Sequence, residues 1–297
     1  MTNPNELEAL FRPKTETAWN VLNLGAGVQS SCLALMAARG EFDPQLDFCV
    51  FSDTQAEPAG VYDWLAWLEK ELPFPVYRVT SGNLEADSLT PRKATQKAKL
   101  YEEGEEYMRR LIPLFGEAPD GKKTAALGRI CTADYKIVPI EREIKKRCGI
   151  LRGQKNLTVT QWMGISWDEM QRMKISQNPW SQMRYPLIER KMRRGDCLEW
   201  MKKNGFPEPP RSACVFCPFH SDKEWRRLRD DEPSEFHRAI EFDRRIRALG
   251  KTDKALKMDV FLHSSCLPLE EVDFDNPQDR GQMAWDFQAE CEGLCGT

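Results

Sequence analysis

The sequence predicts an α/β protein: a mostly parallel sheet flanked by helices, followed by a helical C-terminal region that carries a cysteine cluster. Short apolar runs alternate with segments of helical composition over the first 80 residues. The alternation returns between residues 133 and 165, and helical patterns prevail after residue 191. Strand, turn and helix repeating at this spacing indicate parallel strands joined by crossover helices. Ligands of such sheets bind beyond the carboxyl ends of the strands, so the residues that follow each strand are the first site candidates.

The first unit is expected between residues 19 and 38. Trp19–Leu24 is a short apolar run typical of a buried strand, Gly25-Ala-Gly27 interrupts it, and Ser30–Ala38 has helical composition. Small residues let the backbone curl tightly around an anion, and the start of a helix adds partial positive charge. Hydroxyls of Ser30 and Ser31 add two donors. The turn is a candidate phosphate loop; the alternative is a glycine turn that serves geometry alone.

The second and third strands are expected at 46–51 and 75–79, with helical spacing between them at 61–68. The second strand runs into Ser-Asp-Thr-Gln-Ala-Glu, which places Asp53 and Glu57 at the carboxyl edge beside the loop. A carboxylate at this position suits Mg²⁺ or a ribose hydroxyl. The alternative for Asp53 is a capping role at the following turn or helix.

Residues 81–128 interrupt this rhythm. They are dense in charge of both signs, which favours a solvated helical insertion over a mobile lid. Beyond them we expect a helix at 133–147, strands at 157–165 and 184–188, and a helix at 234–249. The chain then divides into a polar N-terminal tail (1–18), an α/β domain (19–190) and a helical C-terminal region (191–297).

Charge and hydropathy exclude several classes of protein. The 43 Lys and Arg residues nearly balance the 46 Asp and Glu residues, giving a net charge of −3, which argues against a general coating for polyanions. No run approaches the roughly 18 apolar residues of a membrane span. The first fourteen residues are polar, without the apolar core of a signal peptide, so a cytoplasmic protein is expected.

Ten cysteines are unusual in a reducing compartment, where clustered thiols more often bind metals than form disulfides. Cys214 and Cys217 are separated by two residues and followed by proline, a spacing typical of metal and iron–sulfur ligands. Cys291 and Cys295 form a second pair, and Cys131 precedes a predicted helix. Zinc and a [4Fe–4S] cluster both accept four thiolates, so spacing leaves the two open. The alternatives are two buried thiols for the first pair and a frayed chain end for the second.

Four segments, in order, resemble the phosphoadenosine phosphosulfate (PAPS) reductase-like family of the PP-loop ATP pyrophosphatases, also called adenine nucleotide α-hydrolases. Gly25–Ser31 is similar to their Ser-Gly-Gly-x-Asp-Ser loop, and Phe51–Glu57 to their Asp-Thr-Gly-x-Glu stretch. Ile130–Ile140 resembles their Cys-Cys-x-x-x-Lys-x-x-Pro-Leu segment, and Gly164–Arg172 their Gly-x-Arg-x-x-Glu-x-x-Arg segment. The resemblance spans roughly residues 19–220.

The resemblance implies ATP with Mg²⁺ as ligand, cleavage at the α-phosphate to adenylate an acceptor, and a [4Fe–4S] cluster rather than zinc. It implies catalytic roles for Lys136, Asp53 and Arg172. The nucleotide-binding residues that it implies are Gly25, Ala26, Gly27, Gln29, Ser30, Ser31, Asp53 and Gly164. The cluster ligands would be Cys131, Cys214 and Cys217, with Cys291 or Cys295 as the fourth.

The chain departs from the family pattern at several positions. Gln29 stands in place of the loop aspartate, Ser166 in place of a substrate-binding arginine, and the Glu-Cys-Gly-Leu-His nucleophile motif of the reductases is missing. Two alternatives therefore stay open: a PAPS reductase that makes sulfite, and a nucleotide-sensing subunit without turnover. Relatives also occur in phage genomes and beside CRISPR loci, where the partner would be a nucleoprotein.

Basic residues give the remaining candidates. Lys136 lies one helical turn after Cys131, so both side chains are expected at one cleft. The resemblance implies that this lysine contacts a substrate phosphate or sulfate; the alternative is a solvated helix lysine. The alternative for Arg172 is an ion pair with Asp168 or Glu169. Arginines cluster at 190–194, 226–229 and 244–247, which suits a nucleic-acid backbone, although interleaved acids favour a salt-bridged surface.

Overall fold

A five-stranded, all-parallel sheet forms the centre of the molecule. The computed structural model describes residue 13 and residues 15–95, 100–127, 130–254 and 256–275. Within them the strand order is β3-β2-β1-β8-β9, and every neighbouring pair is parallel. The strands are β1 (Trp19–Leu24), β2 (Phe48–Ser52), β3 (Val76–Val79), β8 (Val159–Met163) and β9 (Ser181–Arg184). The predicted fold class, a parallel α/β sheet flanked by helices, is confirmed.

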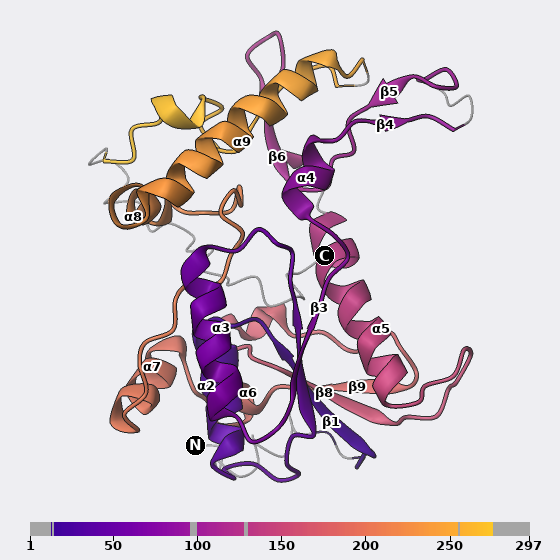
Figure 1. Ribbon diagram of the computed structural model, residues 1–297, viewed down its shortest axis with the longest axis vertical. Coiled ribbons are helices and arrows are strands. Elements are labelled where there is room, and N and C mark those ends of the chain that lie inside the picture. The colour runs from indigo at the N-terminus through magenta and orange to yellow at the C-terminus, as the bar shows by residue number, and fades with distance from the viewer. Residues whose placement is uncertain (1–12, 14, 96–99, 128–129, 255, 276–297) are drawn as a thin grey trace.

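Helices cover both faces of this sheet (Figure 1). One face carries α2 (Val28–Ala38), α3 (Ala59–Glu71), α6 (Pro186–Glu189) and α7 (Arg194–Lys203), and the other carries α5 (Val138–Arg147). Alternate residues of β1 serve the two faces: Leu22 and Leu24 pack with α2 and α3, whereas Val21 packs with Ile140 and Ile144 of α5. This alternation follows from the two-residue repeat of a strand.

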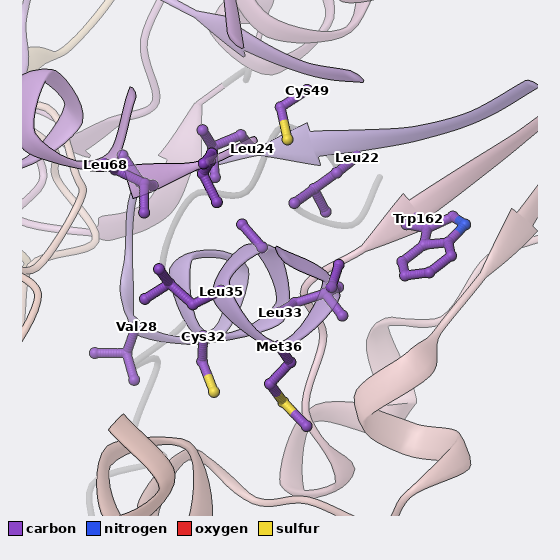
Figure 2. Close-up of a cluster of buried hydrophobic side chains, with 14 of the residues drawn as sticks. Leu22, Leu24, Val28, Cys32, Leu33, Leu35, Met36, Cys49, Leu68 and Trp162 are labelled. Atoms are coloured by element: carbon purple, nitrogen blue, oxygen red, sulfur yellow. The ribbon is translucent and has the colours of Figure 1, made fainter. Parts of the chain in front are cut away.

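Helix α2 is enclosed on all sides. Figure 2 shows Leu33 and Leu35 of this helix near Leu22 and Leu24 of β1, while Cys32 and Met36 point away from the sheet. Every residue of α2 from Val28 to Ala37 is buried, because α7 covers the side that would otherwise meet solvent. The first turn of α2, which carries the candidate phosphate loop, is thereby fixed against the sheet.

A second layer lies beyond the carboxyl ends of the strands (Figure 1). It contains a β10-β6-β7 sheet, in which both strand pairs are antiparallel, and a β4–β5 hairpin. Hydrogen bonds to backbone carbonyls join it to the residues after β2: the Val215 amide donates to the Ala56 carbonyl at 2.8 Å, and the Arg238 guanidinium donates to the Gln55 carbonyl at 3.1 Å. The strands are β4 (Arg92–Lys93), β5 (Glu106–Tyr107), β6 (Leu114–Glu117), β7 (Lys123–Leu127) and β10 (Asp259–Phe261). The helices are α4 (Leu84–Leu89), α8 (Asp222–Asp231) and α9 (Pro233–Thr252), and short 3-10 or π turns cover Thr132–Ile137, Trp167–Arg172 and Leu269–Glu271.

Two predictions of secondary structure are wrong. The insertion at 81–128 is not chiefly helical: it holds the short α4, the β4–β5 hairpin, and strands β6 and β7, of which β6 pairs with the distant β10. The strand expected at 184–188 lies earlier, at Ser181–Arg184, since Pro186 begins helix α6. No helix in the described part of the chain is long and apolar enough to cross a membrane.

Candidate nucleotide site at the sheet edge

The candidate loop lies where the order of the sheet reverses. From β1 the chain proceeds to β2 and β3 on one side, while β8 and β9 lie on the other side. The gap between β1 and β8 is therefore a topological switch point, the place where parallel α/β sheets bind ligands. Gly25 leaves β1 at this point, Gly164 leaves β8, and Asp53 leaves the adjacent β2.

The loop itself is tightly braced. Ala26 adopts a left-handed backbone with φ 58°, and Gly27 is extended before α2 begins at Val28. The Gly25 amide donates to Ser30 Oγ at 3.2 Å, which closes the loop onto the first turn of the helix. The hydroxyl of Ser31 accepts a 2.9 Å hydrogen bond from the Trp64 indole instead. A left-handed alanine costs energy and persists where its surroundings fix it, as they do here.

Gln29 links the loop to the residues that follow β8. Its amide nitrogen donates to Glu169 Oε2 at 3.1 Å and lies 3.4 Å from Ser166 Oγ, and its oxygen accepts from Arg194 Nη1 at 2.9 Å. Arg172 Nη1 lies 2.8 Å from Glu169 Oε1, so the ion pair considered as its alternative role is present. Burial raises the pKa of Glu169. Sequence reasoning missed Arg194; its only signal was membership of the basic run at 190–194.

Asp53 holds the turn after β2. Its Oδ1 accepts from the Gln55 amide at 2.7 Å and from the Tyr62 hydroxyl at 2.8 Å. Burial, and then the neighbouring Asp53, raise the pKa of Tyr62, which keeps the hydroxyl a donor. Oδ1 of Asp53 thus has the capping role that was considered for this residue. The described residues supply no hydrogen bond to its other oxygen, Oδ2.

Lys136 is buried rather than solvated, contrary to the alternative considered for it. Its side chain is 7% exposed and its Nζ lies 3.7 Å from Oε1 of Glu57, a carboxylate that is 2% exposed. The π-helical turn Thr132–Ile137 carries this lysine, and Ser52 Oγ at the end of β2 donates to the Tyr135 carbonyl of the same turn at 2.5 Å. The turn is therefore attached to the sheet edge, and irregular helical turns of this kind are frequent at functional sites.

Cys214 meets the same carboxylate. Its Sγ lies 3.9 Å from Glu57 Oε1 and 3.4 Å from Thr54 Oγ1, and Ser212 Oγ donates to Glu57 Oε2 at 3.3 Å. Burial, followed by the charge of Glu57, raises the pKa of the Cys214 thiol. The Glu57 carboxylate thus connects the residues after β2 to the cysteine segment and to Lys136. The sequence alone did not predict these partners.

The candidate metal ligands come only partly together. Cys131 and Cys217 are half-buried against the hydrophobic cluster that contains Cys214. Within the described residues, however, no three His, Cys, Asp or Glu side chains stand where they could hold a metal ion. Cys291 and Cys295 lie outside the described residues. The described cysteines thus do not by themselves form a ligand set.

The histidines and the basic clusters have structural partners. His220 donates from Nε2 to the Cys214 carbonyl at 3.0 Å, and burial lowers its pKa to about 3, so it is neutral. His263 lies 2.9 Å from an Asp222 oxygen. Ion pairs engage Arg226, Arg227, Arg229, Arg244 and Arg247 with nearby acids.

Comparison with models of known protein families found no match, and comparison with curated proteins found none. Among solved structures, the chain is similar to the crystal structure of phosphoadenylyl-sulfate (PAPS) reductase from Candida auris in its phosphate complex. The two share 12% sequence identity with a TM-score of 0.40, over 70% of this chain and 82% of the other.

Proposed function

We propose that this protein binds an adenine nucleotide with its phosphates at the Gly25–Ser31 loop and cleaves it between the α and β phosphates. The observation that carries the proposal is the position of the loop: it leaves the central strand at the switch point of the sheet and opens a buried helix. Amides at such a helix start attract phosphate oxygens, and the braced turn fixes their direction beforehand.

The reaction that suits these residues is in-line attack by an acceptor on the α-phosphorus. The bond from the α-phosphorus to the bridging oxygen breaks, pyrophosphate leaves, and the acceptor becomes adenylated while its proton passes to solvent. The buried ammonium of Lys136 would stabilise the negative charge that develops on the phosphate oxygens. Asp53, a hard oxygen donor at the same edge, would hold Mg²⁺, which neutralises phosphate charge when bound. Arg172, already paired with Glu169, would position the segment after β8.

A [4Fe–4S] cluster on Cys131, Cys214, Cys217 and either Cys291 or Cys295 belongs to this proposal, with zinc as the alternative metal. The support is chemical: two cysteines separated by two residues and followed by proline, next to a third in one hydrophobic cluster. Because the described thiols do not form a ligand set on their own, no step of the reaction is assigned to the cluster.

A second candidate function, nucleotide sensing without turnover, is favoured by one observation. Gln29 and Ser166 replace two charged residues of the family pattern, and in this chain they lie 3.4 Å apart across the switch point. The contact between the two replacements is neutral, while Gln29 also hydrogen-bonds the charged side chains of Glu169 and Arg194. Such a site suits retention of a nucleotide more than its conversion.

Calorimetry on anaerobically purified protein tests the proposal, with Mg-ATP and PAPS titrated in parallel. We expect Mg-ATP to bind, and Ser30→Ala to weaken it about tenfold because the variant loses both the loop brace and a hydroxyl donor. Ser88→Ala is the matched control, since it also removes a buried serine hydrogen bond, to the Leu84 carbonyl in α4. Absence of ATP binding, or equal losses in the two variants, would overturn the proposal; preference for PAPS would favour the reductase.

A further inference from the structure

A basic cavity of about 600 Å³ lies beside the candidate nucleotide site. It is lined by residues from the start of α7, from the segment between α7 and α8, and from the first turns of α8; α7 and α8 lie at the lower and upper left of Figure 1. Its volume lies within the range typical of small-molecule sites. Its charged lining residues are Arg194, Arg211, Lys223, Arg227, Glu208 and Glu224.

Four basic side chains and two carboxylates line this cavity. Arg227 makes 2.8 and 3.1 Å hydrogen bonds to Glu224 Oε1, and Arg211 Nη1 approaches Oε2 of the same carboxylate at 3.6 Å. Glu224 therefore contacts two guanidinium groups, and Arg227 Nη1 also pairs with Glu232 Oε1 at 2.5 Å. Lys223 has no ion-pair partner in the described part of the chain, and Arg194 Nη1 donates to the side-chain oxygen of Gln29 at 2.9 Å.

Arg211 adds a further guanidinium group to the lining of this cavity. Its Nε is buried and has no hydrogen-bond partner among the described residues. Guanidinium groups pair with phosphate through directed N–H bonds, so the lining of this cavity suits a phosphate.

Arg194 joins the cavity to the loop. It lines the cavity, and its guanidinium holds Gln29 in the first turn of α2, so a group bound in the cavity lies next to the phosphate loop. We propose that this cavity binds the phosphate-bearing acceptor of the reaction, either a small phosphate monoester or the phosphate of a nucleic-acid strand. That the bound ligand is the acceptor of the reaction rests on the proposed function; that the cavity binds a phosphate does not.

The experiment titrates two probes, ribose 5-phosphate and a 5′-phosphorylated single-stranded DNA octamer, with and without saturating α,β-methylene-ATP. Lys223→Glu is the test variant, because this exposed lysine can change without breaking an ion pair. Lys155→Glu makes the same change of charge on an exposed lysine shortly before β8 begins, at the opposite edge of the sheet. We expect at least one probe to bind, about tenfold more weakly to Lys223→Glu and within twofold of wild type to Lys155→Glu.

The probe that binds identifies the source of the phosphate: ribose 5-phosphate alone indicates a small molecule, and the octamer a nucleic acid. Failure of both probes, equal losses in the two lysine variants, or competition between the probe and the ATP analogue would overturn the inference, since competition places the probe in the phosphate loop. If the analogue does not bind but a Lys223-dependent probe does, the inference stands and the proposed nucleotide chemistry fails.

Discussion

The buried pair of Lys136 and Glu57 offers the sharpest test of the site's energetics. Both side chains are almost fully removed from water, at 7% and 2% exposure. Replacing Lys136 by methionine keeps the length of the side chain but removes the ammonium group that lies 3.7 Å from Glu57 Oε1. An uncompensated buried charge destabilises a protein by about 3–5 kcal/mol. That is a large share of the roughly 5–15 kcal/mol that separates folded from unfolded states.

The assay is urea unfolding, with the free energy of unfolding taken from wild type, Lys136→Met, Glu57→Gln and the double variant. The double variant should recover most of the loss, because it buries no lone charge, giving a coupling energy of at least about 2 kcal/mol. Lys145→Met is the matched control: Lys145 lies 3.8 Å from Glu141 but is 42% exposed, so the loss should stay below about 1 kcal/mol. Equal small losses at the two lysines would refute the reasoning.

Three further predictions follow from packing, protonation and ligand chemistry. Gly250→Ala should destabilise the fold by about 1–3 kcal/mol, since the added methyl would lie 2.7 Å from a valine methyl group. Gly195→Ala is the control: its methyl would lie in open space and should stabilise helix α7 slightly. Thermal unfolding of the two variants compares these effects. Burial raises the pKa of Glu169 above its ordinary value of 4.5, so the folded state binds the proton more tightly and the wild type loses stability as pH rises through the raised pKa. The free energy of unfolding of Glu169→Gln, relative to that of wild type, should therefore increase as pH rises from below 4.5, and a difference that does not change with pH would contradict this. Replacing Cys214 and Cys217 together by serine should abolish the iron content of anaerobically purified protein; unchanged iron would exclude the cluster, and zinc in its place would identify the other metal.

Much of the sheet could be predicted because its strands are marked locally. Trp19–Leu24 matches its prediction at both ends, since an apolar run is followed directly by small residues that break it. β9 is different: Ser181–Arg184 is polar and lies at the edge of the sheet, so it has little apolar signal, while the more apolar residues after it belong to α6, which begins at Pro186. Neighbouring strands, not local composition, define such an edge strand.

The insertion shows the same limit at longer range. Its strand β6 pairs with β10, more than 140 residues later, and charge-dense composition gives no sign of that partner. Residues 81–128 therefore resembled a solvated helix, although tertiary pairing makes much of the segment extended. Short strands depend on their partners more than on intrinsic preference.

For the candidate site, the sequence could identify residue types but not their partners. The loop at Gly25–Ser31 and the carboxylates after β2 were located by their place behind strands. The burial of Lys136 against Glu57, and the link from Gln29 to Arg194, join residues 79 and 165 positions apart, so only the folded arrangement reveals them.

The most direct test of the central claim is product analysis after Mg-ATP is incubated with anaerobically purified protein, with and without a phosphate-bearing acceptor. Phosphorus NMR and chromatography then quantify each nucleotide and phosphate species. The account predicts pyrophosphate in equal amount to AMP or adenylated acceptor, with the yield strongly reduced in Lys136→Met. Intact ATP under all conditions, or ADP with inorganic phosphate, would contradict it.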